Sequence, residues 1–200
     1  MTPPSGAAEL RVDPASAALL IVDVQVKLAA AMDPQAFAAC ERNILTLIEL
    51  ARRLKLPMVV SEQYPRGLGA TVPGIAAELE AAVAAGSRLL RLEKTAFACT
   101  EDPAFAPLLE QLGTQRRQWL VTGMESHVCV WQTVRGLLAL GRAVQVIEDA
   151  VLSRQPANHR VGLRLCERAG AVVTSTETVA FDALVRAGSE DFKAISRRVK

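Results

Sequence analysis

The sequence predicts an α/β protein, a three-layer α/β/α domain built on a six-stranded, mostly parallel, Rossmann-like sheet. Short apolar runs alternate with stretches of helical periodicity along nearly the whole chain, which is the pattern of repeated strand–helix units. The chain has 200 residues, of which 50% are hydrophobic, enough for one domain with a substantial core. We therefore expect a flexible N-terminal arm over residues 1–15 and a single domain over residues 16–200.

The predicted strands are short apolar runs that stop at polar or charged residues. The continuous run from Ala17 to Val22 is typical of a strand that is buried on both faces. Five further strands are expected over residues 57–61, 88–93, 117–121, 143–147 and 171–175.

Helical periodicity fills the intervals between these strands. Apolar residues recur three and four positions apart in residues 37–55, where Ile44, Leu47, Ile48 and Ala51 share one face. Further helices are expected over residues 75–85, 102–112, 129–140, 156–169 and 178–187. A glycine-rich loop is expected over residues 64–73, and the basic residues from Arg197 to Lys200 are interpreted as a frayed tail.

Composition and charge exclude several classes of function. The formal net charge is +2, and no basic stripe alternates with aromatic residues, so we expect no nucleic-acid partner. No apolar run approaches the roughly 18 residues that a membrane span needs, and no signal peptide is visible, so we expect no membrane partner. The four cysteines form no C-x-x-C pair, which favours neither a disulfide framework nor a zinc site and indicates a cytoplasmic setting.

Three residues that are distant in sequence are predicted to meet at one edge of the sheet. Asp23 follows the first strand, Lys94 follows the third, and Cys129 lies just past the fourth, at the start of a helix. Ligands of open parallel sheets bind outside the carboxyl ends of the strands. The sequence therefore predicts a site that combines a carboxylate, a cation and a thiol.

These three groups suit nucleophilic attack on a carbonyl carbon. Lys94 and the helix N-terminus are expected to favour the thiolate of Cys129. Asp23 is expected to act as general base and then as acid, and the backbone N–H groups of Glu125 and Cys129 to face the developing oxyanion. The expected product of the attack is a thioester, which water then hydrolyses.

The same residues carry a family resemblance. The segments Leu19–Gln25, Glu93–Phe97 and Val121–Cys129 resemble the three motifs of the isochorismatase-like cysteine hydrolases. Residues 61–73 and 192–196 are similar to the subgroup of isochorismatase domain-containing proteins. The resemblance implies an Asp23–Lys94–Cys129 catalytic triad, a non-proline cis peptide before Glu125, and a homo-oligomer that acts on a small molecule.

The chain departs from the nicotinamidases of that superfamily, which resemble metal-dependent binders with histidines between the first and second motifs. No histidine lies between Asp23 and Lys94. We therefore expect no metal and no other cofactor, and a substrate with an amide, carbamoyl or related C–N bond. Two alternatives remain open: a vinyl ether hydrolase of the isochorismatase type, in which the thiol is incidental, and a weakly catalytic oligomeric interaction protein.

Other residues near the strand ends are candidates for the pocket wall. Gln25, Tyr64, Phe97 and His127 are predicted to bind substrate, although for His127 a surface position at the helix start is an equal alternative. Cys99 follows Lys94 closely and could edge the pocket. The remaining cysteines, Cys40 and Cys166, and His159 are interpreted as structural residues.

Overall fold

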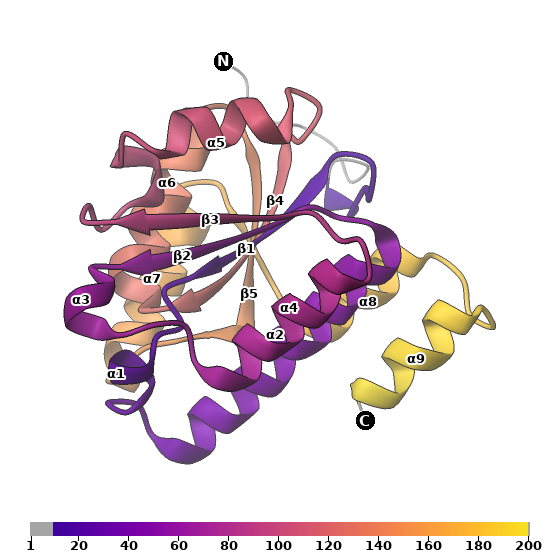
Figure 1. Cartoon of the computed structure of the whole chain (residues 1–200), viewed down its shortest axis with the longest axis horizontal. Helices are drawn as coiled ribbons and strands as arrows, with labels where there is room; N and C mark the ends of the chain where they lie inside the picture. Colours follow the sequence, from indigo (N-terminus) through magenta and orange to yellow (C-terminus); the bar gives the residue numbers. More distant parts are fainter. Residues whose placement is uncertain (1–9, 200) are drawn as a thin grey trace.

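The computed structural model describes residues 10–199, in which one six-stranded sheet has parallel pairing throughout. The strand order is β3-β2-β1-β4-β5-β6, so β1 and β4 lie at the centre (Figure 1). The strands are β1 (Ala17–Val22), β2 (Met58–Gln63), β3 (Leu89–Lys94), β4 (Gln118–Met124), β5 (Ala143–Leu152) and β6 (Val172–Thr174).

Helices cover both faces of this sheet and enclose a separate apolar core on each. One core contains residues of α2 (Pro34–Leu54), α4 (Pro73–Ala84), α8 (Thr176–Leu184) and α9 (Glu190–Arg198). The other contains residues of α5 (Phe105–Leu112), α6 (Trp131–Ala139) and α7 (Pro156–Arg168). The predicted three-layer α/β/α architecture is thus confirmed. Within residues 10–199, no helix has both the length and the apolar character that crossing a membrane requires.

The central position of β1 explains its continuous apolar sequence. All of its residues are buried, because β2 and β4 flank it and helices cover both faces. Gly123 of β4 pairs with Val22 and adopts a φ of 111°. A Cβ atom at Gly123 would overlap the backbone of Val22, so only glycine lets the two strands remain paired to their carboxyl ends.

Helix α2 shows how local signals set the boundaries of an element. The side chain of Asp33 caps its first turn by accepting a hydrogen bond from the Ala36 N–H at 2.9 Å, and Pro34 occupies the first helical position. The helix therefore begins three residues before the predicted start at residue 37. It ends at Lys55, which adopts a left-handed conformation with a φ of 56°.

Three helices lie outside the predicted set. The short helices α1 (Val26–Ala29) and α3 (Pro65–Leu68) are below the length at which periodicity is detectable. Helix α9 extends to Arg198, so a frayed tail from Arg197 is wrong as far as the described residues reach. Ser189 caps this helix by accepting from the Phe192 N–H at 3.0 Å. Arg53 of α2 pairs with Asp191, which fixes the helix to the domain.

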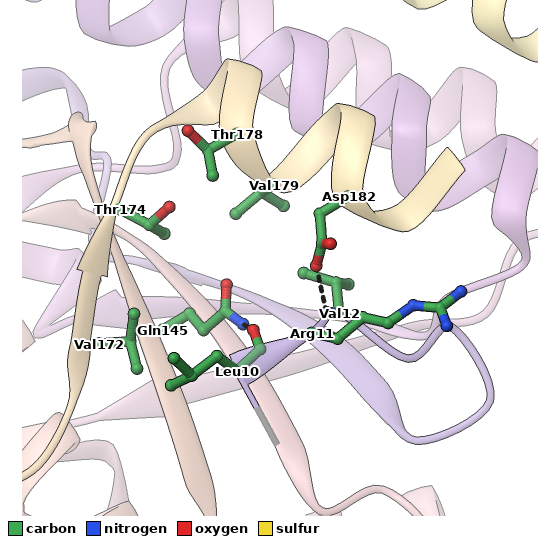
Figure 2. Close-up of a pocket in the computed structure, with 9 residues that line it drawn as sticks. All are labelled: Leu10, Arg11, Val12, Gln145, Val172, Thr174, Thr178, Val179 and Asp182. Atoms are coloured by element: carbon green, nitrogen blue, oxygen red, sulfur yellow. Dashed lines mark hydrogen bonds between the residues drawn. The ribbon is translucent and has the colours of Figure 1, made fainter. Parts of the chain in front are cut away.

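Residues 10–15, which we expected in the flexible arm, pack against the domain. Val12 is buried and its N–H donates to Asp182 Oδ2 at 2.5 Å, and Gln145 Nε2 donates to the Leu10 carbonyl at 2.8 Å. Figure 2 shows these residues around a pocket of about 490 Å³ that is also lined by β6 and α8. None of the predicted triad residues lines it. The rest of the predicted arm, residues 1–9, lies outside the described residues.

Candidate active site

The structure brings Asp23, Lys94 and Cys129 together at the carboxyl edge of the sheet. Asp23 follows β1 directly, and Lys94 is the last residue of β3. Cys129 lies in a π-helical turn, η3 (Ser126–Val130), between β4 and α6. All three residues are buried. In Figure 1 the arrowheads of β2 and β3 mark this edge, near α1 and α3.

A buried ion pair forms the centre of the site. Lys94 Nζ lies 2.7 Å from Asp23 Oδ2, and both side chains are 0% exposed. The same ammonium group donates to Gln63 Oε1 at 2.8 Å, to the Phe97 carbonyl at 3.0 Å and to the Ala96 carbonyl at 3.3 Å. Its three N–H bonds are thus fully used by acceptors of the protein, which fixes the cation beside the carboxylate.

The second oxygen of Asp23 also has a fixed partner. Ser61 Oγ donates to Asp23 Oδ1 at 2.7 Å. Ser61 and Gln63 are functional residues that the sequence prediction did not assign. Their signal is the polar alternation at the end of an apolar strand, because positions 61 and 63 lie on the same face of β2. Ser61 holds the Asp23 carboxylate, and Gln63 holds the Lys94 ammonium group.

The environment of Cys129 differs from the one we expected. Burial is the largest influence and raises the pKa of its thiol; the negative charge of Asp23 and a hydrogen bond to that carboxylate raise it further, while Lys94 lowers it. Burial therefore works against the thiolate that we expected at rest, although Lys94 acts in its favour as predicted. The surroundings of Cys129 favour a protonated thiol near a carboxylate base.

Glu125 is held firmly beside this thiol. The peptide bond between Met124 and Glu125 is cis, as the resemblance implies. The Glu125 side chain accepts from the Arg154 backbone N–H at 2.9 Å and from Arg154 Nε at 3.2 Å. Its carbonyl accepts from Val128 and Val130. The role of the Glu125 and Cys129 N–H groups in an oxyanion hole stays a prediction.

The four predicted substrate-binding residues lie in different environments. Gln25 is 0% exposed, and its amide bonds to Gln63 N, Gln63 O and Gly69 O, so it holds the loop after β2 instead of facing a substrate. Tyr64 and Phe97 are 55% and 54% exposed. Tyr64 lines a depression of about 370 Å³ beside the end of β3. His127 is half-buried, and its Nδ1 lies 3.1 Å from Ser153 Oγ.

The other cysteines are buried, and only Cys99 shares the charged neighbours Asp23 and Lys94 with Cys129. Burial raises the pKa of Cys40 to about 12 and that of Cys166 to about 12, as expected for cysteines of the core. Cys99 is also buried, near Asp23, and burial followed by that charge raises its pKa. Among residues 10–199, no cluster of three or more histidine, cysteine or acidic side chains is arranged to hold a metal ion.

Comparison with known proteins assigns the chain to a family. Residues 17–178 match the isochorismatase domain. The chain belongs to the isochorismatase family. It is 32% identical to human isochorismatase domain-containing protein 2 over 192 residues, which is 95% of this chain and 86% of the human protein. The predicted subgroup is thereby confirmed, and the family assignment supports a hydrolase.

Two solved structures share this fold. The MAR1 ribonuclease of Caenorhabditis elegans superposes with a TM-score of 0.81 at 30% identity, over 94% of this chain and 92% of the nematode protein. The YcaC gene product of Escherichia coli, described as an octameric hydrolase of unknown specificity, superposes with a TM-score of 0.82 at 20% identity, over 98% and 92% of the two chains. Both comparisons agree with the sheet and layers described above.

Proposed function

We propose that this isochorismatase-family protein hydrolyses a small amide, carbamoyl or related C–N substrate through a thioester on Cys129, without a metal. The observation that supports this proposal best is the buried Asp23–Lys94 pair, at 2.7 Å, whose charges both act on the nearby thiol of Cys129. The residues between Asp23 and Lys94 include no histidine that could bind a metal ion. Localisation in the cytoplasm remains part of the proposal.

The proposed reaction begins with attack of the Cys129 sulfur on the substrate carbonyl carbon while the thiol proton moves to Asp23. The N–H groups of Glu125 and Cys129 donate to the oxyanion that forms. The intermediate collapses, the C–N bond breaks, and Asp23 gives its proton to the departing nitrogen. A water molecule then attacks the thioester and gives a proton to Asp23. The C–S bond breaks, Asp23 returns that proton to the Cys129 sulfur, and the acid product leaves.

Lys94 has an electrostatic role in this scheme. Its ammonium group pairs with the Asp23 carboxylate at 2.7 Å, which offsets the cost of burying that negative charge. The hydrogen bond from Ser61 has the same effect on the second carboxylate oxygen. In the proposed scheme, this buried and oriented carboxylate is the group that accepts the thiol proton.

A small activated ester tests the nucleophile directly. Incubation with p-nitrophenyl acetate should release p-nitrophenolate and leave an acetyl group on Cys129, which peptide mass spectrometry detects. Cys129→Ala should abolish both signals, whereas the matched control Cys166→Ala should keep them, since Cys166 lies in the core among apolar residues. Equal acetylation of Cys40, Cys129 and Cys166 would overturn the proposal.

The same variant separates the alternatives. Turnover of isochorismate that survives in Cys129→Ala would show a vinyl ether hydrolase that relies on Asp23. Breakdown of an RNA probe that survives in Cys129→Ala would likewise place the reaction elsewhere. An acetylated Cys129 without turnover on a panel of amides would instead support the interaction protein.

We also propose that the chain forms a homo-oligomer. Val26, Tyr64 and Phe97 are exposed apolar or aromatic side chains that follow β1, β2 and β3 at the same edge of the sheet. Exposed apolar groups of this kind mark contact surfaces. Mass photometry should show an assembly larger than the 21.4 kDa chain. A single monomeric species at micromolar concentration would contradict this.

A further inference from the structure

Both histidines of the chain lie in one line of hydrogen-bonded side chains beside the Glu125–Cys129 segment. Ser126 Oγ lies 2.9 Å from His159 Nδ1 and 2.6 Å from Ser153 Oγ. Ser153 Oγ lies 3.1 Å from His127 Nδ1. Asn158 Nδ2 lies 3.4 Å from His127 Nε2. The line joins the turn that carries the nucleophile to the loop before α7 and to α7 itself.

One arrangement of protons satisfies every group of this line. In it, the Asn158 amide nitrogen donates to His127 Nε2, and His127 carries its proton on Nδ1. That proton goes to Ser153, whose hydroxyl donates to Ser126. The Ser126 hydroxyl then donates to His159 Nδ1, which must be unprotonated. Each side chain has one donor and one acceptor role, and no two donors face each other.

The backbone of the same segment is also in close contact with α7. A Cβ atom at Gly162 would lie 2.6 Å from the Ser126 carbonyl carbon and oxygen and 2.8 Å from the His127 nitrogen. Glycine is therefore required for α7 to approach the turn this closely. The Glu125 side chain is tied to Arg154 in the preceding loop. The position of the Glu125–Cys129 backbone thus depends on the region from Ser153 to Gly162.

We propose that Ser126, Ser153 and His159 are positioning residues that hold the Glu125–Cys129 backbone in its reactive geometry, and that they do so only while His159 Nδ1 is unprotonated. This inference rests on the proposed function, because it assigns the N–H groups of that backbone to the oxyanion. It adds residues outside the triad and a pH dependence to that function.

The surroundings of His159 favour the unprotonated form. Burial is the main cause that lowers the pKa of His159. The charge of Glu148 on β5 raises this pKa, and the charge of Arg160 on the same helix lowers it. Three other elements pack against α7, which carries His159. The turn η3 contributes His127, next to the Glu125–Arg154 pair, and α6 contributes Arg135, which pairs with Glu101. Strand β6 has no titratable side chain. His159 is accordingly neutral near pH 7.

Protonation of His159 would break the order of the line. Nδ1 would then present a proton to the Ser126 hydroxyl, so Ser126 and Ser153 would both have to reverse direction. His127 Nδ1 would have to accept, and its proton would move to Nε2, facing the Asn158 donor. The line can reverse only if His127 changes its tautomer and the Asn158 amide turns over. In the proposal, this rearrangement loosens the hold of α7 on the turn as the pH falls through the pKa of His159.

Two substitutions at residue 159 separate the hydrogen bond from its titration. His159→Asn keeps an acceptor near the position of Nδ1 but does not titrate, and His159→Leu removes the acceptor. The steady-state rate with p-nitrophenyl acetate is measured for both from pH 5 to pH 9. The Asn variant should stay within about 3-fold of the unmodified protein at pH 8 and lose part of its acid limb, since the acceptor is preserved. The Leu variant should lower kcat about 10-fold at pH 8 with little change in KM, and its difference from the unmodified protein should shrink at low pH.

Controls distinguish a positioning role from a structural one. Asn158→Ala removes only the long bond at the outer end and should leave kcat within about 2-fold. Ser153→Ala, whose thermal unfolding is followed in parallel, should reproduce the kcat loss of His159→Leu while the protein stays folded. An acid limb that is the same in His159→Asn as in the unmodified protein would overturn the inference.

The experiment also separates this inference from the proposed function. Acetylation of Cys129 in the unmodified protein, together with unchanged pH profiles in both His159 variants, would refute the positioning role and leave the nucleophile assignment intact. Absence of acetylation at Cys129 in the unmodified protein would refute the proposed function itself.

Discussion

Two ion-pair regions of the molecule differ in their access to water. Asp23 and Lys94 pair with side chains that are 0% exposed. On α2, Glu49 pairs with Arg52 and Arg53, and Arg53 reaches Asp191 of α9; the two arginine side chains are 34% and 23% exposed. Burying an ion pair has a large desolvation cost, whereas a partly exposed network has a small one and contributes little. The comparison indicates that the α2 network joins two helices, whereas the cost of burying Asp23 and Lys94 agrees with the chemical role that we propose for them.

The largest effect should come from removing one partner of the buried pair. Lys94→Met leaves the Asp23 carboxylate buried without its cation, which should lower the free energy of unfolding by about 3–5 kcal/mol and abolish turnover of p-nitrophenyl acetate. Chemical denaturation and steady-state kinetics measure the two effects.

A double variant sharpens this result. Asp23→Asn combined with Lys94→Met leaves no buried charge, so most of the lost stability should return while the activity stays absent. If the double variant were as unstable as Lys94→Met, the pair would be a stabilising element and the contrast with the α2 network would fail.

A smaller loss is expected from Ser61→Ala, which removes the hydrogen bond to Asp23 Oδ1. A hydrogen bond to a charged group contributes roughly 1.5–3 kcal/mol, so kcat should fall about 10-fold to 100-fold. Thr122→Val is the matched control, because Thr122 is equally buried and donates only to the Leu20 carbonyl at 3.2 Å. Equal losses of kcat in the two variants would mean that Ser61 only supports the fold.

In the α2 network, Arg53→Met should lower the free energy of unfolding by about 0.5–1 kcal/mol and leave kcat unchanged. The ion pairs that it removes are already screened by water. The Lys193–Glu190 pair within α9 is more exposed still, and Lys193→Met should show no measurable change in denaturation midpoint. A loss from Arg53→Met as large as that from Lys94→Met would contradict the distinction between the regions.

The smallest effect concerns the pH dependence of stability. Burial raises the pKa of Glu49, but hydrogen bonds and charges from Arg52 and Arg53 outweigh it, and the pKa is lowered overall from 4.5. A carboxyl whose pKa is lowered in the folded state contributes stability above its unfolded value and loses it as the pH falls below that value. Denaturation between pH 7 and pH 3 should therefore show a slightly steeper loss for the unmodified protein than for Glu49→Gln. Identical slopes would show that the pairs have no net effect.

The strands and helices were largely readable from the sequence because hydrophobic periodicity reports burial directly. The prediction placed β1 at its observed limits, since a strand buried on both faces is apolar at every position. It ended β4 and β5 too early, at residues 121 and 147. Both strands continue through polar or glycine residues. These residues can belong to a strand because the neighbouring strand supplies hydrogen bonds to their backbone.

The site was only partly readable for a related reason. Asp23, Lys94 and Cys129 stand at the ends of apolar runs, and the rule for parallel sheets brings such ends together. Ser61 and Gln63 have no motif of their own, and the partners of Gln25 lie 38 and 44 positions away along the chain. The sequence indicates that these side chains are polar, whereas only the fold shows which groups they contact.

By itself, the sequence determined the α/β class, the family and the three residues that meet at the carboxyl edge, because each depends on local patterns and the order of strands. The tertiary structure decided the direction in which the pKa of the Cys129 thiol is shifted, since that depends on burial and on the nearby charges of Asp23 and Lys94. It also decided the place of His127 and His159, which are 32 positions apart yet share one line of hydrogen bonds. Electrostatics and hydrogen bonding act through distances in space, which the strand pairing sets and the local sequence does not record.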